Sequence, residues 1–384
     1  MNDFLILFLL VVVQWRVTAL LFGVAGRRWS GRKLLAARAS VLLFDAAVVF
    51  GFLLSLPDVM VSLHLPGTPS LVAGAAALVY FVSSTGALVV WYIAKLFHRI
   101  FDHRMDPGRR RVLRTAGNVL MASPLAALAA GFVARTDFHV REIDMPVSGL
   151  PDALHGLRVL HLSDIHLSAF LSERELARVI DASNGLHANL AVITGDLIST
   201  FGDPLDACIR QLARLKSDAG SFGCLGNHEH YVRAEDYAQT AAARAGIRFL
   251  RGQAETLRFG GARLRLAGVD YQPKSQQAWY LHGAERLIEP GAVNLLLSHN
   301  PDVFPVAVRQ GWDVMLAGHT HGGQVTVEIL EQTLNPARFF TPYVYGLYRS
   351  ANSAAYVTRG IGTIGIPARI GAQPEITLVR LRKA

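Results

Sequence analysis

The sequence is poor in cysteine and in charged residues. It contains two cysteines, Cys208 and Cys224, in 384 residues, which is too few for a disulfide framework. Cys224 lies in an apolar run that predicts a buried strand, so we expect it to be a small core residue. Charged residues make up 17% of the chain and apolar residues 51%, and no internal repeat or low-complexity tract is evident. The mean hydropathy of +0.30 is high for a purely soluble protein and indicates a membrane portion.

The positive charge of the chain is concentrated in its first third. The whole chain has a formal net charge of +9, which by itself would suggest a nucleic-acid partner. Residues 1–114, however, carry 13 Lys/Arg and 5 Asp/Glu, whereas residues 115–384 carry 25 and 24. The excess therefore lies beside apolar segments, where basic residues set the orientation of a membrane protein. We expect no nucleic-acid partner.

Four apolar runs occupy this first third, at Phe4–Val24, Ala39–Leu56, Leu71–Ala94 and Thr115–Ala134. About 20 apolar residues are needed to cross the hydrocarbon layer. Leu71–Ala94 carries no charge, while Asn118 and Pro124 weaken the last run. The pattern predicts a transmembrane region over residues 1–135 with three to four helices. Arg16 and Asp45 would be costly against lipid, so we expect them either to face the bundle interior or to form an intramembrane pair.

The distribution of basic residues predicts the orientation of these spans. Lys and Arg are frequent in 27–38 and 95–114 and absent from 57–70, as expected if the first two stretches are cytoplasmic. With four spans, everything after Thr136 is then outside the cell. Without the fourth span it stays inside. We predict a multi-pass protein of the plasma or inner membrane with an exoplasmic C-terminal domain.

The C-terminal part of the chain has the pattern of an α/β domain. Residues 136–156 form a polar stretch with Pro146 and Pro151, which predicts a linker. From Leu157 to the end, short apolar runs alternate with amphipathic helical segments. One such helix should begin after Ser172, since Ser172 and Glu175 have the spacing of a capping box. We expect strands near 325–329, 354–358 and 375–381 to complete a second sheet.

Polar clusters follow five of the apolar runs in this domain. They are Asp164-Ile165-His166, Gly195-Asp196, Gly226-Asn227-His228-Glu229, Ser298-His299-Asn300 and Gly318-His319-Thr320-His321. Open α/β sheets place their sites at the carboxyl ends of strands, so these clusters should meet at one edge. The clusters supply seven oxygen or imidazole ligands and no thiolate: Asp164, His166, Asp196, Asn227, His299, His319 and His321. Seven ligands are too many for one tetrahedral zinc, but suit two cations that share a carboxylate. This mixture favours Mn, Fe or Zn over Ca or Mg.

With these blocks in this order, residues 155–384 resemble the calcineurin-like metallophosphoesterases. Gly318-His319-Thr320-His321-Gly322-Gly323-Gln324 and Thr358-Arg359-Gly360-Ile361-Gly362 are similar to the membrane-associated YkuE/YaeI-type branch of that family. The resemblance implies a two-sheet αββα sandwich over residues 157–384, preceded here by the α-helical transmembrane region. It also implies a phosphoesterase that attacks a phosphate ester with metal-bound hydroxide.

The resemblance further implies a role for each matched residue. Asp164, His166, Asp196 and His321 would hold one cation, and Asp196, Asn227, His299 and His319 the other, so that Asp196 bridges them. His228 would protonate the leaving oxygen. Two positions depart from the family pattern: Asp270-Tyr271, where relatives often carry a second acidic residue, and Ser199, where some branches carry an acid.

Several roles are left open by the sequence. Glu229 either orients a neighbouring histidine or is a turn carboxylate, and Arg359 contacts either a phosphate or a structural carboxylate. His230 is a weaker candidate for substrate contact. The favoured function is hydrolysis of a phosphodiester from a lipid or envelope substrate, so a lipid-linked phosphate ester is the expected partner. The alternatives are a UDP-2,3-diacylglucosamine-type pyrophosphatase with a cytoplasmic active site and a non-catalytic membrane binding protein.

Overall fold

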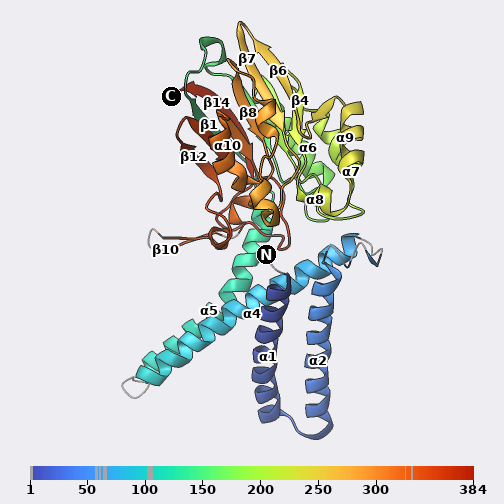
Figure 1. Ribbon diagram of the computed structural model, residues 1–384. Coiled ribbons are helices and arrows are strands. Elements are labelled where there is room, and N and C mark those ends of the chain that lie inside the picture. The colour runs from blue at the N-terminus through green and yellow to red at the C-terminus, as the bar shows by residue number, and fades with distance from the viewer. Residues whose placement is uncertain are drawn as a thin grey trace. The chain divides into compact units, whose positions relative to one another are not determined.

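The computed structural model describes residues 3–56, 59, 62–63, 67–101, 107–324, 326–329 and 332–384. These residues form two compact units (Figure 1). One comprises Met1–Phe132 with Gly365–Ala368, and the other comprises Val133–Ile364 with Arg369–Ala384.

The first unit is built from long helices: α1 (Asp3–Arg28), α2 (Gly31–Leu54), α4 (Gly67–Phe101) and most of α5 (Pro107–Ala134). Within the described part of the chain, three helical segments are long and apolar enough to cross a membrane: Leu5–Arg28, Gly31–Leu54 and Gly67–Leu96. The fourth expected run falls in α5, whose apolar part is the shorter Ser123–Ala134. The number of spans and their orientation stay predictions.

Polar side chains inside this unit bond to one another across the helices. Asp45 of α2 accepts hydrogen bonds from the Gln14 amide and the Thr18 hydroxyl of α1, and both of these α1 side chains are buried. Arg16 donates instead to the Tyr92 hydroxyl of α4. The described partners of Asp45 are therefore uncharged, which matches an interior position rather than a pair with Arg16.

The second unit contains two six-stranded sheets. The first has the order β1 (His139–Val147), β14 (Glu375–Lys383), β2 (Arg158–Leu162), β3 (Leu190–Thr194), β4 (Ser221–Cys224), β5 (Ile247–Phe249). The second has the order β12 (Gly346–Ser350), β13 (Ser353–Val357), β9 (Val314–Ala317), β8 (Val293–Leu297), β7 (Ala262–Gly268), β6 (Gln253–Phe259). The central strands run parallel: β2 to β5 in the first sheet, and β7, β8, β9 and β13 in the second. Their carboxyl ends therefore lie at a common edge within each sheet.

Three details differ from the sequence expectations. The stretch 136–156, expected to be a linker, contains β1, which pairs with β14 in parallel. The last strand, β14, was expected in the second sheet, but it lies in the first, antiparallel to β2. Residues 327–329 and 332–334 form a separate two-stranded ribbon, β10–β11. An apolar strand pattern predicts burial but not which of two stacked sheets accepts the strand.

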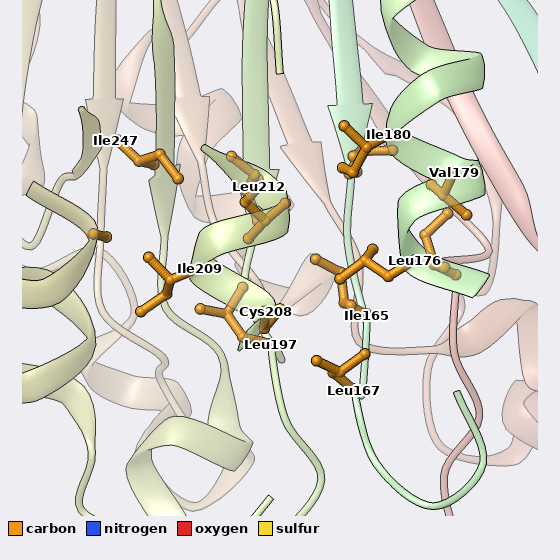
Figure 2. Packing of buried hydrophobic residues seen from close by; sticks show 14 of the residues in the cluster. Ile165, Leu167, Leu176, Val179, Ile180, Leu197, Cys208, Ile209, Leu212 and Ile247 are labelled. Atoms are coloured by element: carbon orange, nitrogen blue, oxygen red, sulfur yellow. The ribbon is translucent and has the colours of Figure 1, made fainter. Parts of the chain in front are cut away.

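Helices cover both outer faces of the sandwich. One core cluster packs α6 (Glu173–Asn184), α7 (Leu205–Leu212) and α9 (Glu235–Arg244) on the first sheet, and Figure 2 shows side chains of this cluster. A second cluster lies between the sheets, and a third packs α10 (Phe304–Gln310) on the second sheet. The predicted αββα sandwich is confirmed.

The predicted capping box is present at the start of α6. The Ser172 hydroxyl accepts from the Glu175 backbone N–H, and the Glu175 carboxylate accepts from the Ser172 N–H at 2.7 Å. Leu176, Val179 and Ile180 then bury the apolar face of the helix. The helix thereby anchors the chain just after the first polar cluster.

Candidate metal centre

The strand ends bring the predicted ligands together. β2 is followed by Asp164 and His166, β3 by Asp196, β4 by Asn227, β8 by His299, and β9 by His319 and His321. Carboxylate and imidazole atoms of these residues gather in two overlapping groups, in each of which the ligand atoms lie within 4.8 Å of one another. We call them the Asp164 group (Asp164, His166, Asp196, His321) and the His299 group (Asp196, His299, His319).

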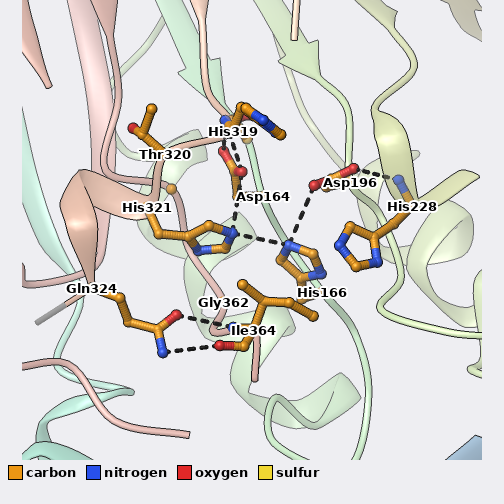
Figure 3. Close-up of polar contacts among 12 residues, drawn as sticks. Asp164, His166, Asp196, His228, His319, Thr320, His321, Gln324, Gly362 and Ile364 are labelled. Carbon is orange, nitrogen blue, oxygen red and sulfur yellow. Dashed lines mark hydrogen bonds and ion pairs between the residues drawn. The ribbon is translucent and has the colours of Figure 1, made fainter. Parts of the chain in front are cut away.

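The Asp164 group is fully buried and its nitrogens face one another (Figure 3). The Nε2 atoms of His166 and His321 are 3.1 Å apart. His321 Nε2 lies 3.4 Å from Asp164 Oδ1, and His166 Nε2 lies 3.5 Å from Asp196 Oδ2. Two imidazole nitrogens and two carboxylates thus point at a common space, the arrangement that a cation requires.

The His299 group uses the same carboxylate oxygen. His299 Nε2 lies 3.0 Å from Asp196 Oδ2, and His319 Nδ1 lies 3.2 Å from His299 Nε2. The Asn227 side-chain oxygen is 3.0 Å from His299 Nε2 and extends this group. Since Asp196 Oδ2 faces both groups, it stands where a ligand shared by two cations would have to be.

Hydrogen bonds on the far side of the rings orient two of the histidines. His299 Nδ1 lies 2.6 Å from the Thr194 carbonyl, which requires the proton on Nδ1. His166 Nδ1 lies 3.2 Å from the Ser199 hydroxyl. These contacts favour Nε2 as the ligating atom, as is usual for metal-binding histidines. The donor set therefore fits divalent cations that accept nitrogen and oxygen ligands.

The protonation states are also suited to ligation, with one exception. Burial lowers the pKa of His166 and of His319 to about 3, so both imidazoles are neutral. Burial would raise the pKa of Asp196, but the charges of His299 and His228 outweigh it and hold that pKa well below its usual range. Burial would likewise lower the pKa of His299, but Asp196 outweighs it and raises that pKa to about 9. A proton on His299 thus occupies the position that a cation would take.

The backbone at the site is held in an unusual conformation. Five of the predicted ligands have φ in the left-handed region: Asp164 (51°), His166 (50°), Asp196 (52°), His319 (75°) and His321 (53°). For residues other than glycine this costs about 1 kcal/mol or more each, and such strain is concentrated at functional sites. The neighbouring glycines permit close packing, since a Cβ on Gly226 would collide with the Asp196 carboxylate.

His228 lies beside both groups. Its backbone N–H donates to Asp196 Oδ1 at 2.9 Å, and its ring centre is 4.7 Å from that of His166. Its Nδ1 is 2.6 Å from the Ser199 carbonyl, so Nδ1 carries a proton and Nε2 is the atom left for proton exchange. The sequence did not indicate this role for the Ser199 backbone.

The family match agrees with this geometry. Residues 157–323 match the calcineurin-like phosphoesterases. This chain contains a calcineurin-like metallophosphoesterase domain. A similar protein is the transmembrane protein with metallophosphoesterase domain of Danio rerio, which is 33% identical over 258 residues. The match covers 64% of this chain but only 57% of the fish protein.

Two bacterial relatives support the predicted branch. The metallophosphoesterase YkuE of Bacillus subtilis is 27% identical over 71% of this chain and 97% of its own length. Phosphodiesterase YaeI of Escherichia coli is 29% identical over 58% of this chain and 82% of its own length. The resemblance to the YkuE/YaeI-type branch is confirmed.

The sequence left two roles open for Glu229 of this metallophosphoesterase domain, and its hydrogen bonds are with backbone groups. Its buried carboxylate accepts backbone N–H groups of Gly226 (2.8 Å), Asp196 (3.0 Å) and Leu197 (2.7 Å). It therefore ties the loop after β4 to the loop after β3. The acidic residue supports the backbone of Asp196 rather than orienting an imidazole.

The contacts of Arg359 and His230, whose roles the sequence left open, are structural. Arg359 Nε lies 3.9 Å from the buried Glu375 carboxylate, and its guanidinium carbon is 4.3 Å from the centre of the Tyr345 ring. His230 is exposed and pairs with Glu235 at 2.7 Å. Neither contact is with a predicted ligand.

Arg369 is a supporting residue that the sequence did not indicate. It is buried and donates to the backbone carbonyls of His321 (2.8 Å), Arg359 (2.7 Å) and Gly362 (3.1 Å). It thus joins the histidine loop after β9 to the loop after β13. A single arginine in an irregular segment has no spacing that would reveal this function.

Proposed function

We propose that this protein is a membrane-anchored dimetal phosphodiesterase acting on a lipid or envelope phosphate ester. The observation that carries the proposal is that seven oxygen and nitrogen ligands form two groups that share the Asp196 carboxylate, with His228 alongside. Apolar helices long enough to cross a membrane belong to the same chain and support a membrane substrate.

The residues divide into two ligand sets in this proposal. The Asp164 group holds one cation, and the His299 group with Asn227 holds the other. Divalent cations of the Mn, Fe or Zn type supply Lewis acidity and a lowered pKa for bound water. The protein holds Asp196 in place through Glu229 and holds the rings through Thr194 and Ser199.

His228 performs the proton transfer. The Ser199 carbonyl keeps a proton on Nδ1, so a second proton on Nε2 makes the ring an imidazolium. That imidazolium donates its Nε2 proton to the oxygen of the departing alcohol. General acids of this kind contribute about 10²–10⁴-fold to rate.

The activity is tested with the full chain purified in detergent, stripped of metal and reloaded separately with Mn, Fe or Zn. Aryl phosphodiesters, phosphomonoesters and glycerophospholipids are offered in parallel. We expect metal-dependent release of alcohol, with diesters preferred. Asp181→Asn, which alters an exposed carboxylate of α6 paired with Arg214, is the control and should keep full activity. Metal-replete protein without turnover of any ester would contradict the proposal.

The membrane topology is part of the proposal. We place the transmembrane region in residues 1–135, with the metallophosphoesterase domain after it on the exoplasmic side. Lys216→Cys introduces an exposed thiol on that domain, whereas the native Cys208 and Cys224 are buried. An impermeant thiol reagent should label this variant in intact spheroplasts. Labelling only after lysis would place the site in the cytoplasm and favour the pyrophosphatase alternative.

A further inference from the structure

Two tyrosines from different segments of the chain lie beside the candidate metal centre. Tyr231 ends α8 (Asn227–Tyr231), and Tyr271 follows β7. The Tyr231 hydroxyl contributes to the raised pKa of the Tyr271 hydroxyl, so the two side chains interact. At the departure from the family pattern, Asp270 pairs with Arg251 at 2.8 Å, and Tyr271 lies next to the site.

The pair reaches across the site from the general acid to the His299 group. The Tyr231 ring centre lies 5.5 Å from that of His228. The Tyr271 ring centre lies 5.5 Å from that of His319 and 6.0 Å from that of His299. Tyr231 is 44% exposed, so this ring is accessible from solvent. Burial raises the pKa of the Tyr271 hydroxyl, which therefore stays protonated as a hydrogen-bond donor.

The position of His228 determines which half of the substrate these rings meet. A general acid must lie within hydrogen-bond reach of the leaving oxygen. The alcohol attached to that oxygen then leaves beside His228, where Tyr231 forms the adjacent exposed surface. Aromatic faces bind planar and apolar groups well, with a preference for stacked or edge-to-face contact.

We infer that the Tyr231–Tyr271 pair contacts the alcohol half of the substrate and selects leaving groups with a planar or apolar surface. This inference rests on the proposed function, since it assigns the leaving group to the His228 side. Tyr231 supplies the contacting ring. Tyr271 interacts with Tyr231 through its hydroxyl and faces the histidines with its own ring.

The test compares two methyl phosphodiesters whose leaving alcohols match in acidity, phenol and a fluorinated aliphatic alcohol. Metal-reloaded full-length protein is used in detergent. Tyr231→Ala should lower the ratio of kcat/KM for the phenyl ester to that for the aliphatic ester by about 3- to 10-fold, the range measured for aromatic contacts. Tyr231→Phe should keep most of the preference. Tyr271→Phe, which removes only the Tyr271 hydroxyl, should give a ratio between those of the two Tyr231 variants.

Tyr237→Ala is the matched control, because Tyr237 is an exposed tyrosine of α9 that bonds to Asp206. Its ester ratio should equal that of the wild type. Metal content and circular dichroism establish that each variant is folded and loaded. If Tyr231→Ala is not, Tyr231→Leu, which also removes the ring, takes its place. An unchanged ester ratio in the ring-removing variant would overturn this inference alone. Failure of the wild type to hydrolyse either ester would overturn it together with the proposed function.

Discussion

The two ligand groups of this site differ in burial and in what surrounds them. Every member of the Asp164 group is buried, and Arg369 fixes the loop that carries His321. In the His299 group, His319 is partly exposed and Tyr271 is beside it. The Asp164 group is thus enclosed by protein, whereas the His299 group lies on the side that solvent and substrate can approach.

This difference has an electrostatic counterpart. The imidazole of His166 is neutral in the absence of metal, but His299 is held protonated by Asp196. The enclosed group is ready to bind a cation, whereas the open group must first lose a proton. Asp196 belongs to both groups, so its removal is the change with the largest expected effect.

Asp196→Asn should reduce turnover of an aryl phosphodiester to the metal-free rate. The substitution removes the charge of the one carboxylate that faces both groups. Metal content by mass spectrometry should fall along with activity. Full activity with unchanged metal content would mean that the groups do not share a ligand.

His228→Ala should lower the rate with poor leaving groups by about 10²–10⁴-fold while both groups keep their metal. Esters of acidic phenols need less protonation, so their rates should fall much less. A series of esters with leaving groups of graded acidity measures this difference. An equal loss across the series would show that His228 has another role.

Glu229→Ala should impair both groups together. It leaves three buried backbone N–H groups without an acceptor, at about 1–3 kcal/mol each, and it releases the backbone of Asp196. We expect a lower free energy of unfolding and about 10–100-fold weaker metal binding, as for other residues that support ligands. Glu173→Ala, which changes an exposed side chain of α6, provides the control. Loss of stability with normal metal affinity would restrict Glu229 to a folding role.

Metal binding should release protons from only one group near neutral pH. His299 has a pKa of about 9 without metal, so a cation must displace its proton, and the affinity of the His299 group should rise with pH up to about 9. In the Asp164 group, His166 has a pKa of about 3 and no proton to release, and Asp164, whose pKa burial raises to about 6, is mostly ionised at pH 7. Calorimetric titration in buffers of different ionisation enthalpy should therefore detect the release of about one proton when the His299 group binds its cation. Equal proton release on binding of the two cations would mean that the two groups do not differ in protonation before metal binds.

The sequence alone determined the ligands as candidates and the strands that carry them. Runs such as Leu190–Thr194 and Val314–Ala317 are short, apolar and end at glycine, so the residues that follow must lie at a sheet edge. Asp164 and His166 are two residues apart, as are His319 and His321, so these pairs can be recognised in the sequence itself. Burial and turn formation depend mainly on such local patterns.

Only the tertiary structure decided which distant segments meet. The placement of β14 beside β2, the bonds of Glu229 to the loop after β3, and the contact between Tyr231 and Tyr271 all join residues far apart in sequence. The same is true of the left-handed backbone at Asp196, which is not expected from its residue type alone and is held by its surroundings. Apolar periodicity specifies that a segment is buried, whereas the packing of two sheets and their loops selects its neighbours, because many partners offer the same burial.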